Sequence, residues 1–134
     1  MGYAKATGLP RAFAVVPGPG VLNTAAALCT AWGSNTRVYC MTGQVPSTFL
    51  DSGRGHLHEL PDQRATLKTL VKWAERIDDP ADTQALTNKA FEQMLNGRPG
   101  PVALEMCWDT MAKEWEVDVG QGYQTVDPFR FSCL

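Results

Sequence analysis

The chain has 134 residues, of which 44% are hydrophobic and 19% are charged. These proportions are typical of one globular domain with its own core and exclude an intrinsically disordered chain. The formal net charge is -2, so the clustered positive charge that nucleic acids and anionic membranes require is missing, and we expect neither as a partner. Prolines and glycines at 17–20 break the apolar stretch 12–32, which is therefore not expected to cross a bilayer.

The four cysteines predict a reducing compartment. Cys29, Cys40 and Cys107 lie inside apolar runs, Cys133 lies near the end of the sequence, and no Cys-x-x-Cys pair occurs. Because no secretory signal is evident, we interpret them as reduced thiols of the core, although their even number leaves a disulfide framework open. No targeting segment is evident either, which favours a cytoplasmic location.

Helices and strands are predicted to alternate along the chain. The elements, in order, are a helix end at 1–8, a strand at 12–16, a helix at 21–32, a strand at 37–41, a helix at 61–71, a strand at 73–77, a helix at 79–97 and a strand at 102–106. This alternation predicts an α/β fold, a parallel sheet layered with helices. A domain seldom begins with a helix end, so we expect the sheet to lack its first strands and the chain to be part of something longer.

Several elements carry more specific expectations. The helix at 21–32 is apolar almost all round, which predicts burial on more than one side. The continuous apolar run 38–41 is typical of a strand covered on both faces. Asp79 is expected to cap the helix that follows it. An exposed strand at 115–119 is predicted within a linker or tail, residues 110–134, that leads toward a following domain.

The turn Pro17-Gly18-Pro19-Gly20 joins the first strand to its helix. Glycine lacks a side chain and proline fixes φ, so this backbone can lie close against a flat ligand. Asn23, in the first helical turn, can aim its amide at a ring edge. Taken alone, such a turn is more often a plain structural connection between a strand and a helix, and a Rossmann-like phosphate-binding domain is a further alternative.

Three motifs in order and spacing give a more specific interpretation: Gly18-Pro19-Gly20-Val21-Leu22-Asn23, Thr42-Gly43-Gln44-Val45-Pro46 and Gly97-Arg98-Pro99-Gly100-Pro101-Val102. Together they resemble the N-terminal pyrimidine-binding domain of thiamine diphosphate (TPP)-dependent enzymes, in particular acetolactate synthases. The resemblance covers residues 1–109, which would form a partial domain of this thiamine diphosphate-binding fold. It implies thiamine pyrophosphate binding as part of a carboligase or decarboxylase acting on 2-keto acids.

The same resemblance implies where the cofactor lies. In the family, the enzyme is a dimer or tetramer, and the cofactor sits between the pyrimidine domain of one subunit and the diphosphate domain of another. Pro19, Gly20 and Asn23 would then contact the aminopyrimidine ring, and the helix at 21–32 would pack at the subunit interface. Gln44 is expected either to line this site or to bond a neighbouring backbone group.

The parts of the family's machinery that hold metal and start catalysis have no counterpart in this sequence. Diphosphate and Mg²⁺ belong to a domain with a Gly-Asp-Gly signature, which this chain lacks, so we assign no metal ligand. The family's catalytic glutamate belongs upstream of Met1, and neither Glu59 nor Glu105 matches its position. We expect the chain alone to be inactive, and Glu105, in an apolar strand, to be a structural ion pair or to lie at the strand end. Binding of FAD, found in some relatives, stays open.

His58 is the main departure from the acetolactate synthase pattern. It stands where those enzymes carry glutamine and where 2-keto acid decarboxylases carry a histidine pair. A histidine can move a proton near neutral pH, so His58 is a candidate catalytic residue. The alternatives are a loop or capping histidine without chemistry, like His56, which we expect to be solvent-exposed. For the whole chain, a non-catalytic dimerisation or binding module with the same fold remains the other alternative.

Overall fold

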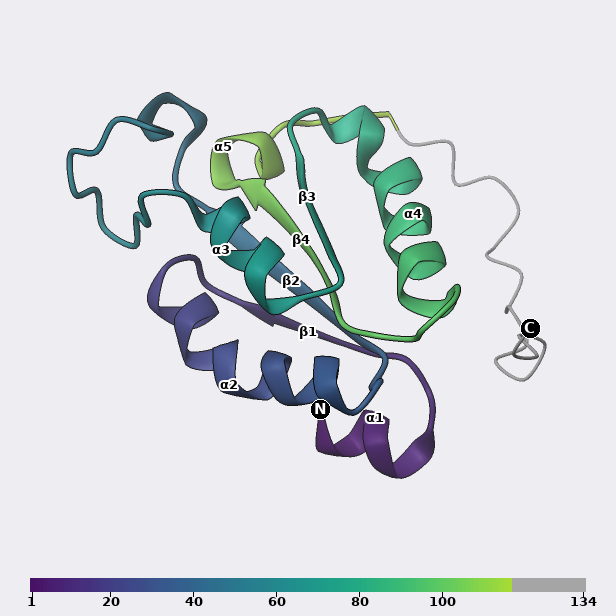
Figure 1. Ribbon diagram of the computed structural model, residues 1–134. Helices are drawn as coiled ribbons and strands as arrows, with labels where there is room; N and C mark the ends of the chain where they lie inside the picture. The colour runs from purple at the N-terminus through teal and green to yellow at the C-terminus, as the bar shows by residue number, and fades with distance from the viewer. Residues whose placement is uncertain (117–134) are drawn as a thin grey trace.

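The computed structural model describes residues 1–116, which form a four-stranded parallel sheet flanked by helices (Figure 1). The elements are α1 (Gly2–Thr7), β1 (Arg11–Val15), α2 (Pro19–Gly33), β2 (Val38–Gln44), η1 (Ser47–Phe49), α3 (Gln63–Leu70), β3 (Trp73–Ile77), η2 (Pro80–Asp82), α4 (Thr83–Leu95), β4 (Val102–Cys107) and α5 (Trp108–Met111). The predicted α/β fold with a parallel sheet is confirmed.

The strand order β1-β2-β4-β3 explains how the helices are layered. The connections from β1 to β2 and from β2 to β3 advance in one direction across the sheet, whereas the connection from β3 to β4 returns. Because parallel crossovers are right-handed, α2 and α3 cover one face and α4 covers the other (Figure 1). All four carboxyl ends therefore meet at one edge of the sheet, beside α5 and the segment 45–62.

Each face of the sheet has its own apolar core. Under α2 and α3 the buried residues are Val21, Leu28, Cys40, Leu67, Val71, Ala74 and Ala103. Under α4 they are Tyr39, Ile77, Ala90, Met94, Val102 and Leu104. These two layers fix the positions of the strand ends from which the candidate site is built.

Local signals in the sequence account for several helix ends. Gly8 ends α1 in the left-handed conformation, with φ 68°, as expected for a glycine after a helix. The Asp62 side chain caps α3 by accepting a bond from the Ala65 amide. Asp79 likewise caps, but it caps the single turn η2 rather than α4, which begins at Thr83.

Two burial predictions were wrong. Helix α2 is buried on one side only: Val21 and Leu28 are inaccessible, whereas Leu22 is 50% exposed and Trp32 is 41% exposed. An apolar sequence pattern shows that the side chains of a helix favour burial, but it does not show whether another segment of the chain packs against each side of that helix. Strand β2 is likewise incompletely covered, because Met41 is 40% exposed where the sheet face extends beyond α4.

The end of the chain also differs from expectation. Trp115 and Glu116 are not in a strand, and the rest of the predicted strand at 115–119 lies outside the described residues, as does most of the predicted tail. Helix α5 follows β4 directly and includes residue 109, and the division of the chain into a partial domain and a tail stays a prediction. Within residues 1–116, no helix combines the length and the apolar composition that a bilayer crossing would need.

Candidate functional site

The turn between β1 and α2 has a backbone conformation that only glycine adopts readily. Gly18 has φ 60° and ψ -109° and precedes Pro19, the first residue of α2. These angles are close to those of the first central residue of a type II′ turn. A Cβ on Gly18 would lie 2.4 Å from the His58 carbonyl oxygen, so a second backbone segment also closes on this glycine. The turn is therefore thin, as its sequence predicts.

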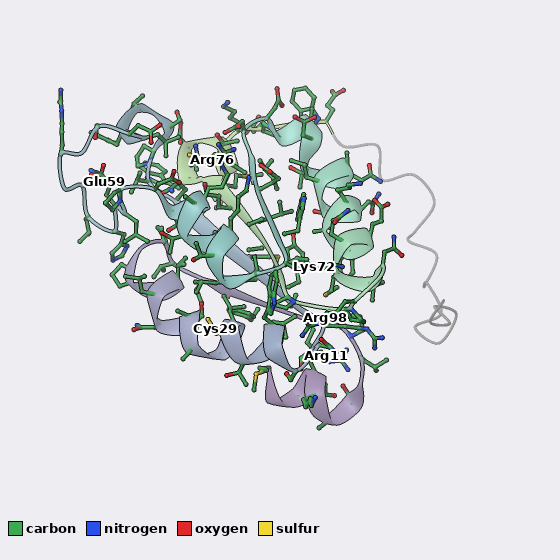
Figure 2. The ribbon with its side chains drawn as sticks, in the orientation of Figure 1. Arg11, Cys29, Glu59, Lys72, Arg76 and Arg98 are labelled. Carbon is green, nitrogen blue, oxygen red and sulfur yellow. The ribbon has the colours of Figure 1, made fainter. Side chains whose placement is uncertain are left out.

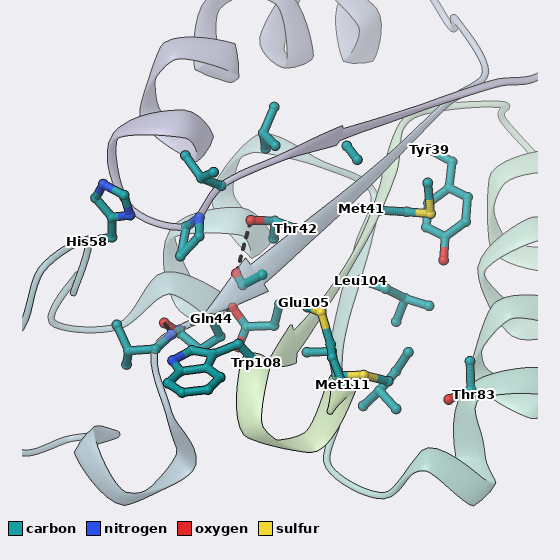
Figure 3. A pocket seen from close by; sticks show the side chains of 18 of the residues that line it. Tyr39, Met41, Thr42, Gln44, His58, Thr83, Leu104, Glu105, Trp108 and Met111 are labelled. Atoms are coloured by element: carbon teal, nitrogen blue, oxygen red, sulfur yellow. Dashed lines mark hydrogen bonds between the residues drawn. The ribbon is translucent and has the colours of Figure 1, made fainter. Parts of the chain in front are cut away.

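His58 is held against this turn by its main chain. Its φ of 70° is positive, which is uncommon for a residue with a side chain. The carbonyl faces Gly18, while the imidazole lies at one end of a cavity in Figure 3. The backbone of His58 thus has a structural role whether or not its side chain takes part in chemistry.

The cavity has a volume of about 860 Å³ and runs along the carboxyl ends of the strands and the sheet face that α4 leaves open. In parallel α/β sheets, ligands bind outside these carboxyl ends. Its walls are mainly apolar, and the lining includes Val16, Pro17, Gln44, His58, Leu104 and Trp108. No lysine or arginine of the described chain lines it. Such a lining fits a flat, weakly polar ring rather than a phosphate group.

Beneath the turn, a hydrogen-bond network centres on the fully buried side chain of Gln63. The Gly18 amide donates to Gln63 Oε1 at 2.8 Å. Gln63 Nε2 donates to the Gly43 carbonyl oxygen at 3.0 Å and to Glu105 Oε2 at 2.8 Å. One side chain of α3 thereby joins the turn to the carboxyl ends of β2 and β4.

Glu105 is the charged member of this network and is fully buried. Arg76 Nε donates to Glu105 Oε1 at 2.6 Å, and the two side chains are 13% and 0% exposed, respectively. Burial alone would lower the pKa of Arg76, but the hydrogen bond and the charge of Glu105 outweigh it, so this pKa is raised. The predicted structural ion pair of Glu105 is confirmed; its partner, Arg76, is labelled in Figure 2.

The predicted site residues fall into two groups. Gln44 and His58 both line the cavity, whereas Pro19, Gly20 and Asn23 do not. The Gln44 side chain is 3% exposed; its Oε1 accepts a bond from the Val45 amide, and its Nε2 donates weakly to Glu105 at 3.5 Å. Gln44 thus both lines the cavity and bonds a neighbouring backbone group, the two alternatives that the sequence left open.

Asn23 and Pro19 face outward from the start of α2, where both are exposed. Among the described residues, no side chain or backbone group forms a hydrogen bond with the Asn23 amide. It is therefore available to a group that approaches from outside this chain. A role for Pro19, Gly20, Asn23, Gln44 and His58 in cofactor binding or catalysis stays a prediction.

Reasoning from the sequence missed Gln63. The one available signal is its spacing: Gln63 begins the stripe that Leu67 and Val71 continue on the inner side of α3. A polar residue at a core position of an amphipathic helix needs buried partners. Nothing in the sequence indicates that those partners are Gly18, Gly43 and Glu105.

Two neighbours of His58, Glu59 and His56, make contacts within the same loop region. The Glu59 carboxylate accepts bonds from the Gly53 and His56 amides at 3.1 and 2.7 Å, so it closes the loop before it. His56 stacks on Phe49, with ring centroids 4.3 Å apart, which corrects the expectation of a merely solvent-exposed side chain. Glu59 therefore has a structural task in this loop.

The cysteines follow the prediction only in part. Cys29, Cys40 and Cys107 are free thiols. Cys40 and Cys107 are buried, as predicted, and burial raises the pKa of Cys40 to about 12. Cys29 lies exposed on α2 (Figure 2), so its assignment to the core was wrong. Cys133 lies outside the described residues.

The α2 amino terminus does not favour the phosphate-binding alternative. A helix start binds phosphate through free backbone amides. Here the Gly18 amide is already bonded to Gln63, and Pro19 has none to offer. Within residues 1–116, no group of three or more His, Cys, Asp or Glu side chains is arranged to hold a metal ion. The residues present fit the ring of a cofactor better than its phosphates.

Comparison with known proteins agrees with this geometry. Residues 1–66 match the family described as thiamine pyrophosphate enzyme, N-terminal TPP binding domain. A probable 2-ketoarginine decarboxylase of Pseudomonas aeruginosa is 31% identical over 111 residues, which cover 83% of this chain and 20% of that protein.

Acetolactate synthases are similar to the same extent. The mitochondrial catalytic subunit of Saccharomyces cerevisiae is 31% identical over 111 residues, covering 83% of this chain and 16% of that subunit. The enzyme of Arthrospira platensis is 32% identical over 105 residues, covering 78% of this chain and 18% of that enzyme. The chain thus spans a fifth or less of the length of these curated relatives.

Proposed function

Since this chain belongs to the thiamine pyrophosphate enzyme family, through its N-terminal TPP binding domain, we propose that it forms the pyrimidine-binding part of a 2-keto acid carboligase or decarboxylase. The observation that carries this proposal is the thin turn at Gly18, which closes on the His58 carbonyl and leads into a helix that carries exposed Asn23, whose side-chain amide bonds no described residue. The names of the relatives, a decarboxylase and acetolactate synthases, support the same class of reaction.

In this proposal, each part of the turn has a separate task. Pro19 and Gly20 offer a flat surface to the aminopyrimidine ring, and Asn23 bonds its polar edge. The apolar walls of the cavity exclude water from the reacting groups. Thiamine diphosphate, when bound, supplies an ylid that acts as carbon nucleophile and electron sink. Mg²⁺ and the diphosphate would be held by a domain outside this chain.

His58 is the proposed proton-handling residue. Its imidazole lines the cavity, and its main chain is fixed against Gly18, so the point of the backbone from which the ring extends is constrained. A histidine so placed can give or take a proton at a substrate held at the strand ends. The assignment requires that His58→Gln lower the turnover of the complete enzyme more than its affinity for cofactor.

We further propose that the outer face of α2 packs against a second copy of the chain in a dimer or tetramer. Leu22 and Trp32 are half exposed on this face, beside Asn23. A subunit that covered them would complete the cofactor site at the same time. Sedimentation would then show self-association, and a monodisperse monomer would argue against this face as an interface.

Titration of thiamine diphosphate tests the proposed function. We expect weak binding by the chain alone and tight binding in complex with a diphosphate-domain partner and Mg²⁺. Asn23→Ala should weaken binding by the complex about tenfold, the effect of losing one good hydrogen bond. Asn88→Ala, which removes an exposed asparagine from α4, is the matched control.

The outcomes separate the candidate functions. If Asn23→Ala binds the cofactor as tightly as the control, the role of Asn23 is wrong. If the chain associates with itself or with a partner but the complex binds no thiamine diphosphate, the chain is a non-catalytic dimerisation module.

A further inference from the structure

We propose that Gln63 is a positioning residue, which locks the Gly18 turn in the conformation that receives the cofactor ring. The use of the turn for a cofactor rests on the proposed function, whereas the lock itself rests only on the geometry below. Gln63 touches neither the cavity nor the exposed face of α2. Its effect on a ligand must therefore pass through the residues it bonds, Gly18, Gly43 and Glu105, and the exchange measurement below isolates the part that passes through Gly18.

The hydrogen bonds allow the Gln63 amide only one orientation. Oε1 faces a donor, the Gly18 amide, whereas Nε2 faces two acceptors, the Gly43 carbonyl and the Glu105 carboxylate. Turning the amide over would place its NH₂ against the Gly18 N–H and its oxygen against the carboxylate. The two acceptors thus aim Oε1 at the turn.

The charge of Glu105 strengthens this orientation. The carboxylate is fully buried and is held from the other side by Arg76 at 2.6 Å. A hydrogen bond from Gln63 to a buried carboxylate is stronger than one between neutral groups. The ion pair between β3 and β4 therefore holds the Gln63 side chain in place, and Gln63 in turn holds the Gly18 amide.

The turn is held from two sides. Gln63 accepts the Gly18 N–H from below, while the His58 carbonyl blocks the space that a Cβ would need. Because Gly18 lacks a side chain, it is otherwise the residue of this turn freest to rotate. Without the bond to Gln63, its amide would be left without an acceptor in a buried position. This contact therefore helps to fix the backbone from which α2, and with it Asn23, begins.

Hydrogen exchange across the turn tests the lock directly. Pro17 and Pro19 have no amide hydrogen, so a peptide that covers 17–20 reports on Gly18 and Gly20 alone. The measurement is made on the complex with its diphosphate-domain partner, without cofactor, and thiamine diphosphate is then titrated. Gln63→Met keeps the length of the side chain and removes its hydrogen bonds.

We expect Gln63→Met to speed exchange of this peptide at least tenfold relative to strand β4 and to weaken cofactor affinity by a similar factor. Met94→Ala is the control, because Met94 is also fully buried but lies in the core under α4. Its loss should speed exchange generally without singling out the turn. Unchanged relative exchange in Gln63→Met overturns the lock, and faster exchange with unchanged affinity overturns the positioning role.

Gln63→Glu provides a second test if Gln63→Met does not fold. The new carboxyl group would face Glu105 on β4, and the other titratable groups nearby include Arg76 on β3, Cys107 on β4 and His58 in the adjoining loop. Two carboxylates in contact repel each other, so the pair takes up a shared proton at a higher pH than an isolated carboxyl group would. When protonated, the variant copies two of the three bonds of the amide, with an O–H toward Glu105 and a carbonyl toward Gly18, and it leaves the Gly43 carbonyl without this donor.

Protection of the turn peptide in Gln63→Glu should therefore increase as pH falls from 8 toward 5, relative to the same peptide in the unmodified complex. A pH profile parallel to that of the unmodified complex overturns the proposal. The proposed function fails separately, if the unmodified complex does not bind thiamine diphosphate. In that case the exchange results still decide whether Gln63 locks the turn.

Discussion

Replacing Gly18 by alanine tests whether the turn is as constrained as its geometry indicates. Gly18 combines a φ of 60° with a ψ of -109°, a region that side chains with a Cβ avoid. The added Cβ would lie 2.4 Å from the His58 carbonyl oxygen and 2.9 Å from its carbonyl carbon. Both neighbours are backbone atoms, so no rotamer change relieves the contact.

The expected cost has two parts. The unfavourable backbone conformation contributes about 1–3 kcal/mol. An ordinary contact needs 3.4 Å or more, so the His58 segment must recede by about 1 Å, and overpacking of this kind costs about 1–3 kcal/mol. Because His58 itself has a φ of 70°, its backbone has little freedom to absorb the shift. We expect Gly18→Ala to lower the free energy of unfolding by at least about 2 kcal/mol.

Urea unfolding followed by tryptophan fluorescence measures this difference. All proteins are compared at one concentration, because self-association would shift the midpoint. With a slope of about 1–3 kcal/mol per molar urea, the loss corresponds to a midpoint lower by roughly 1 M. Gly33→Ala is the matched control: it lies at the end of α2 with no atom within 4 Å of its added Cβ.

The control should be neutral or more stable by up to about 1 kcal/mol, because alanine favours a helix over glycine. The reasoning is refuted if Gly18→Ala unfolds at the same urea concentration as the unmodified chain. It is also refuted if the two substitutions have equal effects, since that would make the close approach of His58 irrelevant.

Two further predictions concern side chains away from the turn. In the unassociated chain, a thiol reagent at neutral pH should modify exposed Cys29 well before buried Cys40, whose pKa is raised to about 12. Peptide mapping by mass spectrometry at a concentration without self-association checks the order, and equal rates would contradict the described burial. Asp109 accepts bonds from the Ser47 amide and hydroxyl, which lower its pKa below 3.8. The ionised Asp109 side chain should stabilise the fold fully at pH values above its ordinary pKa, and this stabilisation should be lost as pH falls through the lowered pKa. Between pH 6 and pH 3, Asp109→Asn should therefore lose less free energy of unfolding than the unmodified chain. Equal losses in the two proteins would exclude a stabilising role for the Asp109 carboxylate.

Elements whose signals are local were predictable from the sequence. Strand β3 has the predicted bounds, Trp73–Ile77, although it is not a continuous apolar run, and the turn residues Asp79 and Pro80 follow its end. Gly8 and Asp79 ended and began helical turns as expected, since capping depends on neighbours within a few residues. The Gly18 turn was recognisable for the same reason.

Burial on a second side was not predictable. Helix α2 has apolar residues almost all round, yet the described chain covers only the side with Val21 and Leu28. An apolar residue lowers its free energy by leaving water, whether its neighbour belongs to the same chain or to another. The sequence therefore indicates that the outer face of α2 tolerates burial, and only the tertiary structure shows that this chain leaves it open.

By itself, the sequence determined the α/β layering, the turn that needs glycine and the need of Glu105 for a partner, because each follows from local conformation or from the cost of burying a charge. Only the tertiary structure decided that Arg76 is this partner and that Gln63 joins Gly18 to Gly43 and Glu105. These contacts link residues up to 45 positions apart in the sequence. Hydrogen bonds depend on distance and direction in space, which chain order does not specify until the strands have paired.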